Sequence, residues 1–291
     1  MISNAVTSSV APTIAVSRYI TLSENRVHYL EAGTGPILLL LHGTALDSAA
    51  LTYGAMIPKL AEHFHVYALD WLGYGESDKP MMDYTSPNYS SLLAEFIEAL
   101  GLETFSIVAF SMGGAMALGY ALEHQEKLHK LVLIDSYGLG RTVHIPTVPY
   151  FLLHLPGVTE LIWKLLTVPK ILELCLKYIV FGSAKRVTPE IMGDVKRQLE
   201  LKDLQRASTS WLRSEIGLWR LATQHKHLGA LNVPTLLLHG SKDIVIPAWR
   251  SRRAARAIPG AQLQMLRGYG HWTPREAAKE VLEYVLHFLT T

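Results

Sequence analysis

The sequence is poor in cysteine: Cys175 is the only one among 291 residues, so no disulfide can form within the chain. The first sixteen residues hold no lysine or arginine, and serine, threonine and proline interrupt their apolar side chains. A secretory signal needs a basic start followed by a continuous apolar stretch. Both absences favour a chain that stays in the reducing cytoplasm, which is the location we expect.

The sequence also lacks a charge imbalance and a long apolar run. Its 27 basic and 25 acidic residues give a formal net charge of +2, so we expect no nucleic-acid partner, which would need a basic face. No uncharged run reaches the roughly 18 apolar residues that a membrane span requires. The stretch 150–181 comes closest, but Pro156, Glu160 and Lys164 are among the residues that interrupt it. Such spacing is typical of amphipathic helices.

Hydrophobic patterning predicts strands that alternate with helices along most of the chain. Strand patterns cover a pair within 19–31 and the short runs 36–41, 65–70, 105–110, 131–135, 234–239 and 261–266. Helical patterns cover 56–62, 89–100, 113–124, 249–258 and 275–289. This order predicts an α/β fold with one mostly parallel, twisted sheet and helices on both of its faces.

The middle of the chain breaks this alternation. Residues 137–232 show helical stretches, frequent proline and glycine, and no strand pattern. We therefore expect a core built from 1–136 and 233–291, with 137–232 inserted as a helical cap. The cap should cover the carboxyl ends of the strands, because ligands of open α/β sheets bind at that edge.

A candidate nucleophile lies between a predicted strand and a predicted helix. Residues 109–114 read Ala-Phe-Ser-Met-Gly-Gly, so small residues flank a tight turn that carries Ser111. The turn would expose the Ser111 hydroxyl at the amino end of the helix, where the helix dipole is positive. A hydroxyl is a weak nucleophile until a base takes its proton. The motif therefore predicts a histidine nearby in space.

Three segments together resemble the α/β-hydrolase family. Residues 41–44 (Leu-His-Gly-Thr) look like its oxyanion loop, 70–77 (Asp-Trp-Leu-Gly-Tyr-Gly-Glu-Ser) like its glycine-rich turn, and 108–114 like its nucleophile elbow. Ala109 stands where that elbow usually has glycine. The resemblance covers nearly the whole chain except the cap and the first sixteen residues, which we expect to form a loose N-terminal arm. It implies the α/β-hydrolase fold and a nucleophile, acid and histidine in that chain order.

The acid and the base follow from this order. Asp243 comes just after the strand pattern 234–239, and His271 lies between glycine and tryptophan after the last strand. By resemblance, His271 is the general base and Asp243 the acid that orients it. Asp135 is a second candidate for the acid, because it also ends a core strand. The resemblance further implies an oxyanion hole from the backbone N–H groups of Thr44 and Met112. We expect no metal and no cofactor.

The cap should select the substrate. Its many apolar side chains predict a small apolar molecule, and we expect Tyr150, Phe151, Trp163 and Trp272 to line the pocket. Some of these apolar side chains could instead face a lipid surface, although no segment should span a membrane. The sequence leaves the oligomeric state open.

Four functions are compatible with these motifs. The first is hydrolysis of a carboxylic ester through an acyl-enzyme, as in carboxylesterases and small lipases. The second is cleavage of a carbon–carbon bond in a dicarbonyl dienoate, because His271-Trp272 and the Ser-Met-Gly-Gly elbow resemble that subfamily. Residues 44–47 (Thr-Ala-Leu-Asp) depart from its glycine- and proline-rich loop. A cofactor-free oxygenase and a non-catalytic binding protein are the remaining alternatives.

Overall fold

The computed structural model describes residues 15–139, 147–201, 203–217 and 226–291. Within these ranges, eight strands form one sheet in the order β1-β2-β4-β3-β5-β6-β7-β8. The pairs β1–β2 and β2–β4 are antiparallel and every other pair is parallel. The strands are β1 Val16–Leu22, β2 Asn25–Ala32, β3 Ile37–Leu41, β4 His65–Leu69, β5 Phe105–Phe110, β6 Leu128–Ile134, β7 Thr235–Gly240 and β8 Gln262–Leu266.

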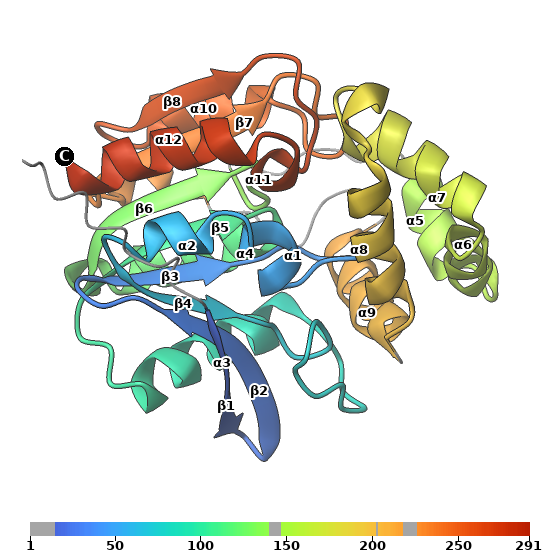
Figure 1. The fold of residues 1–291 in the computed structure, drawn as a ribbon, viewed down its shortest axis with the longest axis horizontal. Helices are drawn as coiled ribbons and strands as arrows, with labels where there is room; N and C mark the ends of the chain where they lie inside the picture. Colours follow the sequence, from blue (N-terminus) through green and yellow to red (C-terminus); the bar gives the residue numbers. More distant parts are fainter. Residues whose placement is uncertain (1–14, 140–146, 202, 218–225) are drawn as a thin grey trace, which may run out of the picture.

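Helices cover both faces of this sheet, as the apolar strands require (Figure 1). One buried cluster joins the sheet to α3 (Ser86–Ala99), α4 (Met112–Glu123) and α10 (Trp249–Ala257). The other joins it to α1 (Ala49–Tyr53), α2 (Ile57–Leu60) and α12 (Ala278–Thr290), and includes Trp272 and Ala277, which flank the short helix α11 (Thr273–Glu276). Alternate residues of β3 enter opposite clusters, so both of its faces are buried. This is the predicted α/β-hydrolase fold.

A group of helices lies beyond the carboxyl ends of the parallel strands, on the right of Figure 1. Its main helices are α5 Thr147–His154, α6 Val158–Leu166, α7 Pro169–Cys175, α8 Pro189–Leu199 and α9 Leu204–Glu215, with a short π-helix at Leu176–Val180. We call residues 147–216 the cap. Polar contacts attach it to the core: Ser86 in α3 accepts from Trp211 Nε1 (3.1 Å) and donates to Glu215 (2.6 Å). The predicted limits at 137 and 232 stay a prediction.

No helix in the described ranges is both long enough and apolar enough to cross a membrane. Residues 1–14, which carry the predicted N-terminal arm, lie outside the described residues.

Helix ends differ most from the sequence prediction. Helix α3 begins at Ser86 rather than 89, because the Thr85 side chain accepts from the Asn88 backbone N–H and caps it. Pro87 looks like a helix breaker in the sequence, yet proline is well tolerated in the first helical turn. The closing helix is divided at Ala277 into α11 and α12. These differences arise from local hydrogen bonds and leave the order of elements unchanged.

The first turn of α4 packs directly on the end of β3, and this contact should be sensitive to one methyl group. A Cβ at Gly113 would lie 2.5 Å from the Leu41 carbonyl oxygen and 2.6 Å from that of His42. We expect Gly113→Ala to lower the free energy of unfolding by about 1–3 kcal/mol through overpacking. Denaturant unfolding monitored by circular dichroism would measure the change.

Gly193 in α8 is the matched control, because a Cβ there would meet only Arg197 Nη1 at 3.6 Å. Gly193→Ala should stabilise the chain by about 0.5–1 kcal/mol, as alanine does in an open helical position. Equal effects of the two substitutions would contradict the close contact between α4 and β3.

Candidate active site

Ser111 occupies a strained turn between β5 and α4. Its φ of 50° and ψ of −116° fall in a region that non-glycine residues rarely adopt. Backbone hydrogen bonds hold it there: Ser111 N donates to the Ile134 carbonyl, and the Ser111 carbonyl accepts from Gly114 N and Tyr137 N, all at 3.0 Å. These bonds attach the strained turn to β6 and to the segment that follows β6. The turn places the Ser111 side chain at the carboxyl edge of the sheet.

Three side chains from separate loops meet in one hydrogen-bonded chain. Ser111 Oγ lies 3.0 Å from His271 Nε2, and His271 Nδ1 lies 2.8 Å from Asp243 Oδ2. The pattern assigns the imidazole proton to Nδ1, which donates to the carboxylate, so Nε2 is free to accept from the hydroxyl. Ser111 is 6 % exposed and His271 is 9 % exposed. The predicted nucleophile, base and acid are therefore brought together in a nearly dry site.

The backbone around Asp243 and His271 fixes both side chains. Asp243 Oδ1 accepts from the N–H groups of Val245 and Ile246, each at 2.8 Å. His271 N donates to the Val180 carbonyl of the cap at 2.7 Å. The carboxylate and the ring are consequently oriented before any substrate binds, which is what a general base needs.

Asp135, the rival acid, lies close by but faces other donors. It accepts from Gly240 N (2.8 Å), from Thr273 N (3.2 Å) and from Thr273 Oγ1 (2.6 Å). The partner of His271 Nδ1 is Asp243. Asp135 instead links the ends of β6 and β7 to the first residue of α11. The geometry therefore favours Asp243 as the acid.

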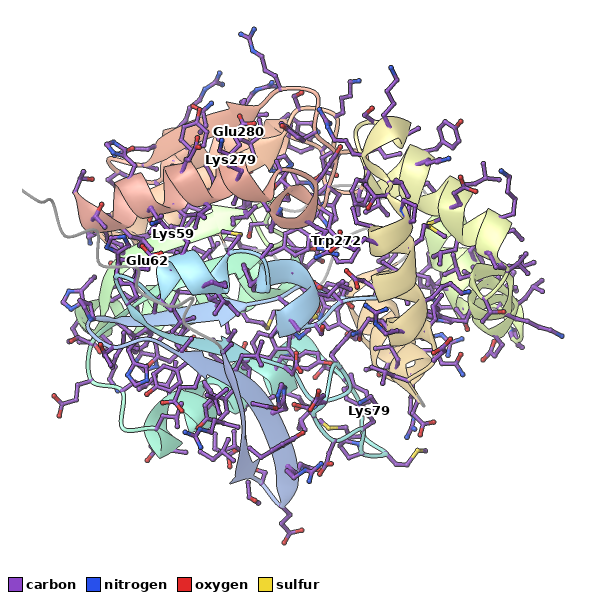
Figure 2. The ribbon with its side chains drawn as sticks, in the orientation of Figure 1. Lys59, Glu62, Lys79, Trp272, Lys279 and Glu280 are labelled. Atoms are coloured by element: carbon purple, nitrogen blue, oxygen red, sulfur yellow. The ribbon has the colours of Figure 1, made fainter. Side chains whose placement is uncertain are left out.

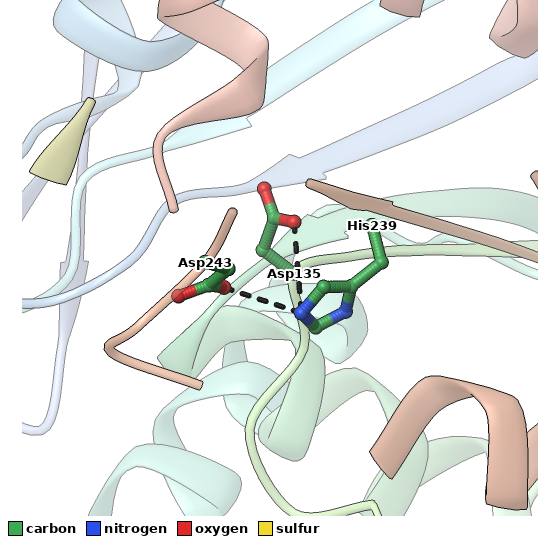
Figure 3. A group of neighbouring side chains, drawn as sticks. All are labelled: Asp135, His239 and Asp243. Atoms are coloured by element: carbon green, nitrogen blue, oxygen red, sulfur yellow. Dashed lines mark ion pairs between the residues drawn. The ribbon is translucent and has the colours of Figure 1, made fainter. Parts of the chain in front are cut away.

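His239, which belongs to none of the sequence motifs, lies close to this site. Its Nε2 lies 3.2 Å from Asp243 Oδ2 and 4.0 Å from Asp135 Oδ1, and Figure 3 shows both carboxylates facing this one ring nitrogen. Nε2 also lies 2.8 Å from the Ile246 carbonyl, and Nδ1 lies 2.7 Å from Ser251 Oγ. The only signal in the sequence is that His239 precedes Asp243 by four residues at a strand end.

Burial and charge act in opposite directions on this cluster. Burial alone would raise the pKa of the Asp243 carboxyl, but His271 and His239 together hold it well below its usual range. Burial raises the pKa of Asp135 to about 6. Burial disfavours the charged form of His239, yet the hydrogen bond to Asp243 and the two carboxylates raise its pKa overall. Asp243 thus stays ionised as the partner of His271.

Asp135, His239 and Asp243 have the spacing of a metal site. One ligand atom from each of Asp135, His239 and Asp243 lies within 4.8 Å of the others. However, backbone N–H groups already occupy oxygens of both carboxylates, and both ring nitrogens of His239 have partners. The donor set therefore fits a hydrogen-bonded support for Asp243, the predicted acid, better than a metal centre.

The predicted oxyanion loop follows β3 beside the elbow. Leu41 pairs with Ala109, so the loop after β3 begins next to Ser111. The Trp71 backbone N–H donates to His42 Nε2 at 3.2 Å, and the Trp71 indole N–H donates to the His42 carbonyl at 3.0 Å. These two bonds hold the loop to the glycine-rich turn. The Thr44 hydroxyl lies 2.7 Å from the Tyr74 hydroxyl. Met112 is the first residue of α4.

The four predicted pocket residues lie in different surroundings. Trp272 is buried and its indole donates to Thr52 Oγ1 at 2.9 Å, while Figure 2 places it where α11, α1 and the cap approach. Trp163 lines a cavity of about 560 Å³ between α6 and α9 that none of the three triad residues lines. Phe151 is exposed, and Tyr150 stacks on His154.

Comparison with known proteins identifies the family. The family model for the alpha/beta hydrolase fold matches residues 36–277. The chain belongs to the α/β-hydrolase family. It is accordingly a hydrolase with the fold of that family.

Relatives with assigned names are similar over nearly the whole chain. A 2-hydroxy-6-oxo-6-(2'-aminophenyl)hexa-2,4-dienoic acid hydrolase of Metapseudomonas resinovorans is 29% identical over 94% of this chain and 91% of its own. An uncharacterized protein of Mycobacterium tuberculosis is 30% identical over 89% and 77%. A solved serine hydrolase involved in carbazole degradation has a TM-score of 0.75 at 25% identity, covering 95% of this chain and 99% of its own.

Isosteric substitution can distinguish Asp243 from Asp135, the two candidates for the acid of this α/β-hydrolase. We expect Asp243→Asn to lower kcat by about ten-thousandfold, because an amide cannot hold His271 in the required tautomer. Asp135→Asn should cost far less activity, since Asp135 makes no hydrogen bond to the triad. Steady-state kinetics on both purified variants would test this. A larger loss for Asp135→Asn would reverse the assignment.

Proposed function

We propose that this α/β-hydrolase is a serine hydrolase with Ser111 as nucleophile, His271 as general base and Asp243 as acid. The observation that carries the proposal is the hydrogen-bonded chain from Asp243 through His271 to Ser111, with distances of 2.8 and 3.0 Å. The positive helix end at Met112 and the low exposure of the site strengthen charge stabilisation there.

The geometry supports a two-step reaction. His271 Nε2 takes the hydroxyl proton while Ser111 Oγ attacks the substrate carbonyl carbon. The backbone N–H groups of Thr44 and Met112 stabilise the resulting oxyanion, a contribution on the order of 3 kcal/mol per donor. Collapse expels the leaving group, which takes the proton from His271, and leaves an acyl-enzyme. Water deprotonated by His271 then attacks, releasing the acid and returning the proton to Ser111.

We propose a carboxylic ester with an apolar acyl or alcohol group as the substrate. Phe110, whose ring centroid lies 5.2 Å from that of His271, gives the triad an apolar neighbour. Residues 44–47 lack the glycine and proline that the carbon–carbon hydrolases carry there. The Trp272 indole, one of the points of likeness to those enzymes, donates its hydrogen bond to Thr52. These features support the ester over the dienoate.

Cleavage of a carbon–carbon bond is the second candidate, and similarity favours it. Relatives named as hydrolases of dienoates or of 2-hydroxymuconate semialdehyde match at 26–29% identity over 92–94% of this chain. That reaction differs in its leaving group, because a carbon atom rather than an oxygen must be protonated. The same Ser111 and His271 would serve both reactions.

The nucleophile assignment predicts the effect of one substitution. Ser111→Ala should lower hydrolysis of p-nitrophenyl esters by at least about ten-thousandfold, because no acyl-enzyme can form. The variant should keep its fold, since the hydroxyl makes no bond beyond the triad in the described residues. A fluorophosphonate should add its mass to the peptide that carries Ser111 in the native chain only. Label on a different peptide would contradict the assignment.

A substrate panel would separate the two candidate reactions. Esters of increasing acyl length and a 2-hydroxy-6-oxo-dienoate should be offered to the native enzyme and to Ser111→Ala. We expect kcat/KM to be higher for the esters and to rise with acyl length as more apolar area is buried. Preference for the dienoate would replace the ester proposal while leaving the triad in place.

A further inference from the structure

The outer surface of the cap carries an unusual concentration of exposed apolar side chains. Ten of the sixteen large apolar side chains exposed in the described residues lie within residues 151–179. We call this set the cap apolar face: it comprises Phe151, Leu152, Leu155, Leu161, Ile162, Leu165, Val168, Leu174, Tyr178 and Ile179. Exposed apolar side chains clustered in this way mark sites of interaction rather than ordinary surface.

The apolar side of helix α6 faces outward. Its most buried side chain is Thr159, which is 3 % exposed and accepts from Arg213 Nη2 at 2.9 Å. Leu161 and Leu165, one turn apart, are 54% and 41% exposed. A helix that packed only against its own protein would bury the leucines and expose the threonine. The cap therefore presents apolar side chains to something outside the chain.

Lysines distributed through the cap apolar face indicate what that partner is. Lys164, Lys170 and Lys177 alternate with its apolar residues, and residues 150–187 hold five basic side chains against two acidic ones. Glu173 pairs with Lys170 and Lys177, which leaves the segment with a net positive charge. Protein–protein interfaces exclude lysine from their centres. Helices that lie on membranes carry it, because the long side chain reaches up to the headgroups.

We propose that the cap apolar face docks on an anionic phospholipid bilayer. Helices α6 and α7 are 9 and 7 residues long, so they would lie in the interface rather than cross it. Tyr178 (67% exposed) and Phe151 (52% exposed) are aromatic side chains of the kind that anchor at the headgroup level. The lysines would face the lipid phosphates.

The docking surface is continuous with the catalytic loop. Ile179 of the cap apolar face precedes Val180, whose carbonyl accepts from His271 N at 2.7 Å. A bilayer against this face would place the loop of the catalytic histidine beside a pool of apolar molecules. Docking on a bilayer would locate the enzyme in the same way whether it cleaves an ester bond or a carbon–carbon bond.

Vesicle co-sedimentation tests the proposal without any assay of activity. The native chain should sediment with vesicles of phosphatidylcholine mixed with phosphatidylglycerol, and less with phosphatidylcholine alone. The double variant Leu161→Glu/Leu165→Glu should bind at least about tenfold more weakly, because two apolar contacts are lost and two negative charges are added. Tyr178→Glu, outside helix α6, should weaken binding in the same direction if the double variant folds poorly.

Met81→Glu is the matched control, because Met81 is an exposed apolar side chain (86%) outside the cap. It should bind vesicles as the native chain does. Absence of vesicle binding by the folded native chain, or binding that none of the cap substitutions weakens, overturns the proposal. A concentration-dependent dimer in light scattering that the same substitutions dissociate, without vesicle binding, would assign the face to a second copy of the chain instead.

Discussion

The geometry of the candidate site depends on the hydrogen bonds that the buried Asp243 carboxylate accepts. A carboxylate taken out of water costs several kcal/mol unless donors surround it. Here two backbone N–H groups hold one oxygen, His271 holds the other, and the His239 ring lies 3.2 Å from it. Because the charge is balanced in place, the ring of His271 is fixed in the orientation that leaves Nε2 toward Ser111.

Support for this carboxylate comes from elements far apart in the sequence. Asp135 directly follows β6 and accepts hydrogen bonds from both Gly240 of β7 and Thr273 of α11. The loops that carry Asp243 and His271 are thus attached to one another independently of the triad. A site built in this way is preorganised, so little reorganisation is needed when charge develops during the reaction.

Most of the fold could be predicted from the sequence, because fully buried strands and surface helices have different hydrophobic periods. That Ser111, Asp243 and His271 lie together could be predicted, because the family resemblance and the strand ends place them at one edge of the sheet. The choice between Asp135 and Asp243 required the geometry, since both end parallel strands. The proximity of His239 depends on a ring orientation that no spacing encodes. The sequence left open whether the apolar side of α6 faces the core or the outside, because periodicity shows that a helix has two faces but not which one is buried.

The cap and the catalytic loop approach so closely that only glycine fits between them. A Cβ at Gly182 would lie 2.4 Å from the Gly268 carbonyl oxygen, and one at Gly270 would lie 2.3 Å from that of Val180. At this junction Gly182 N also donates a hydrogen bond to Glu276. An exchange of caps between family members, whether in evolution or by chimaera construction, would have to preserve this seam. The outer helices of the cap can therefore vary while its inner end stays in contact with the loop of His271.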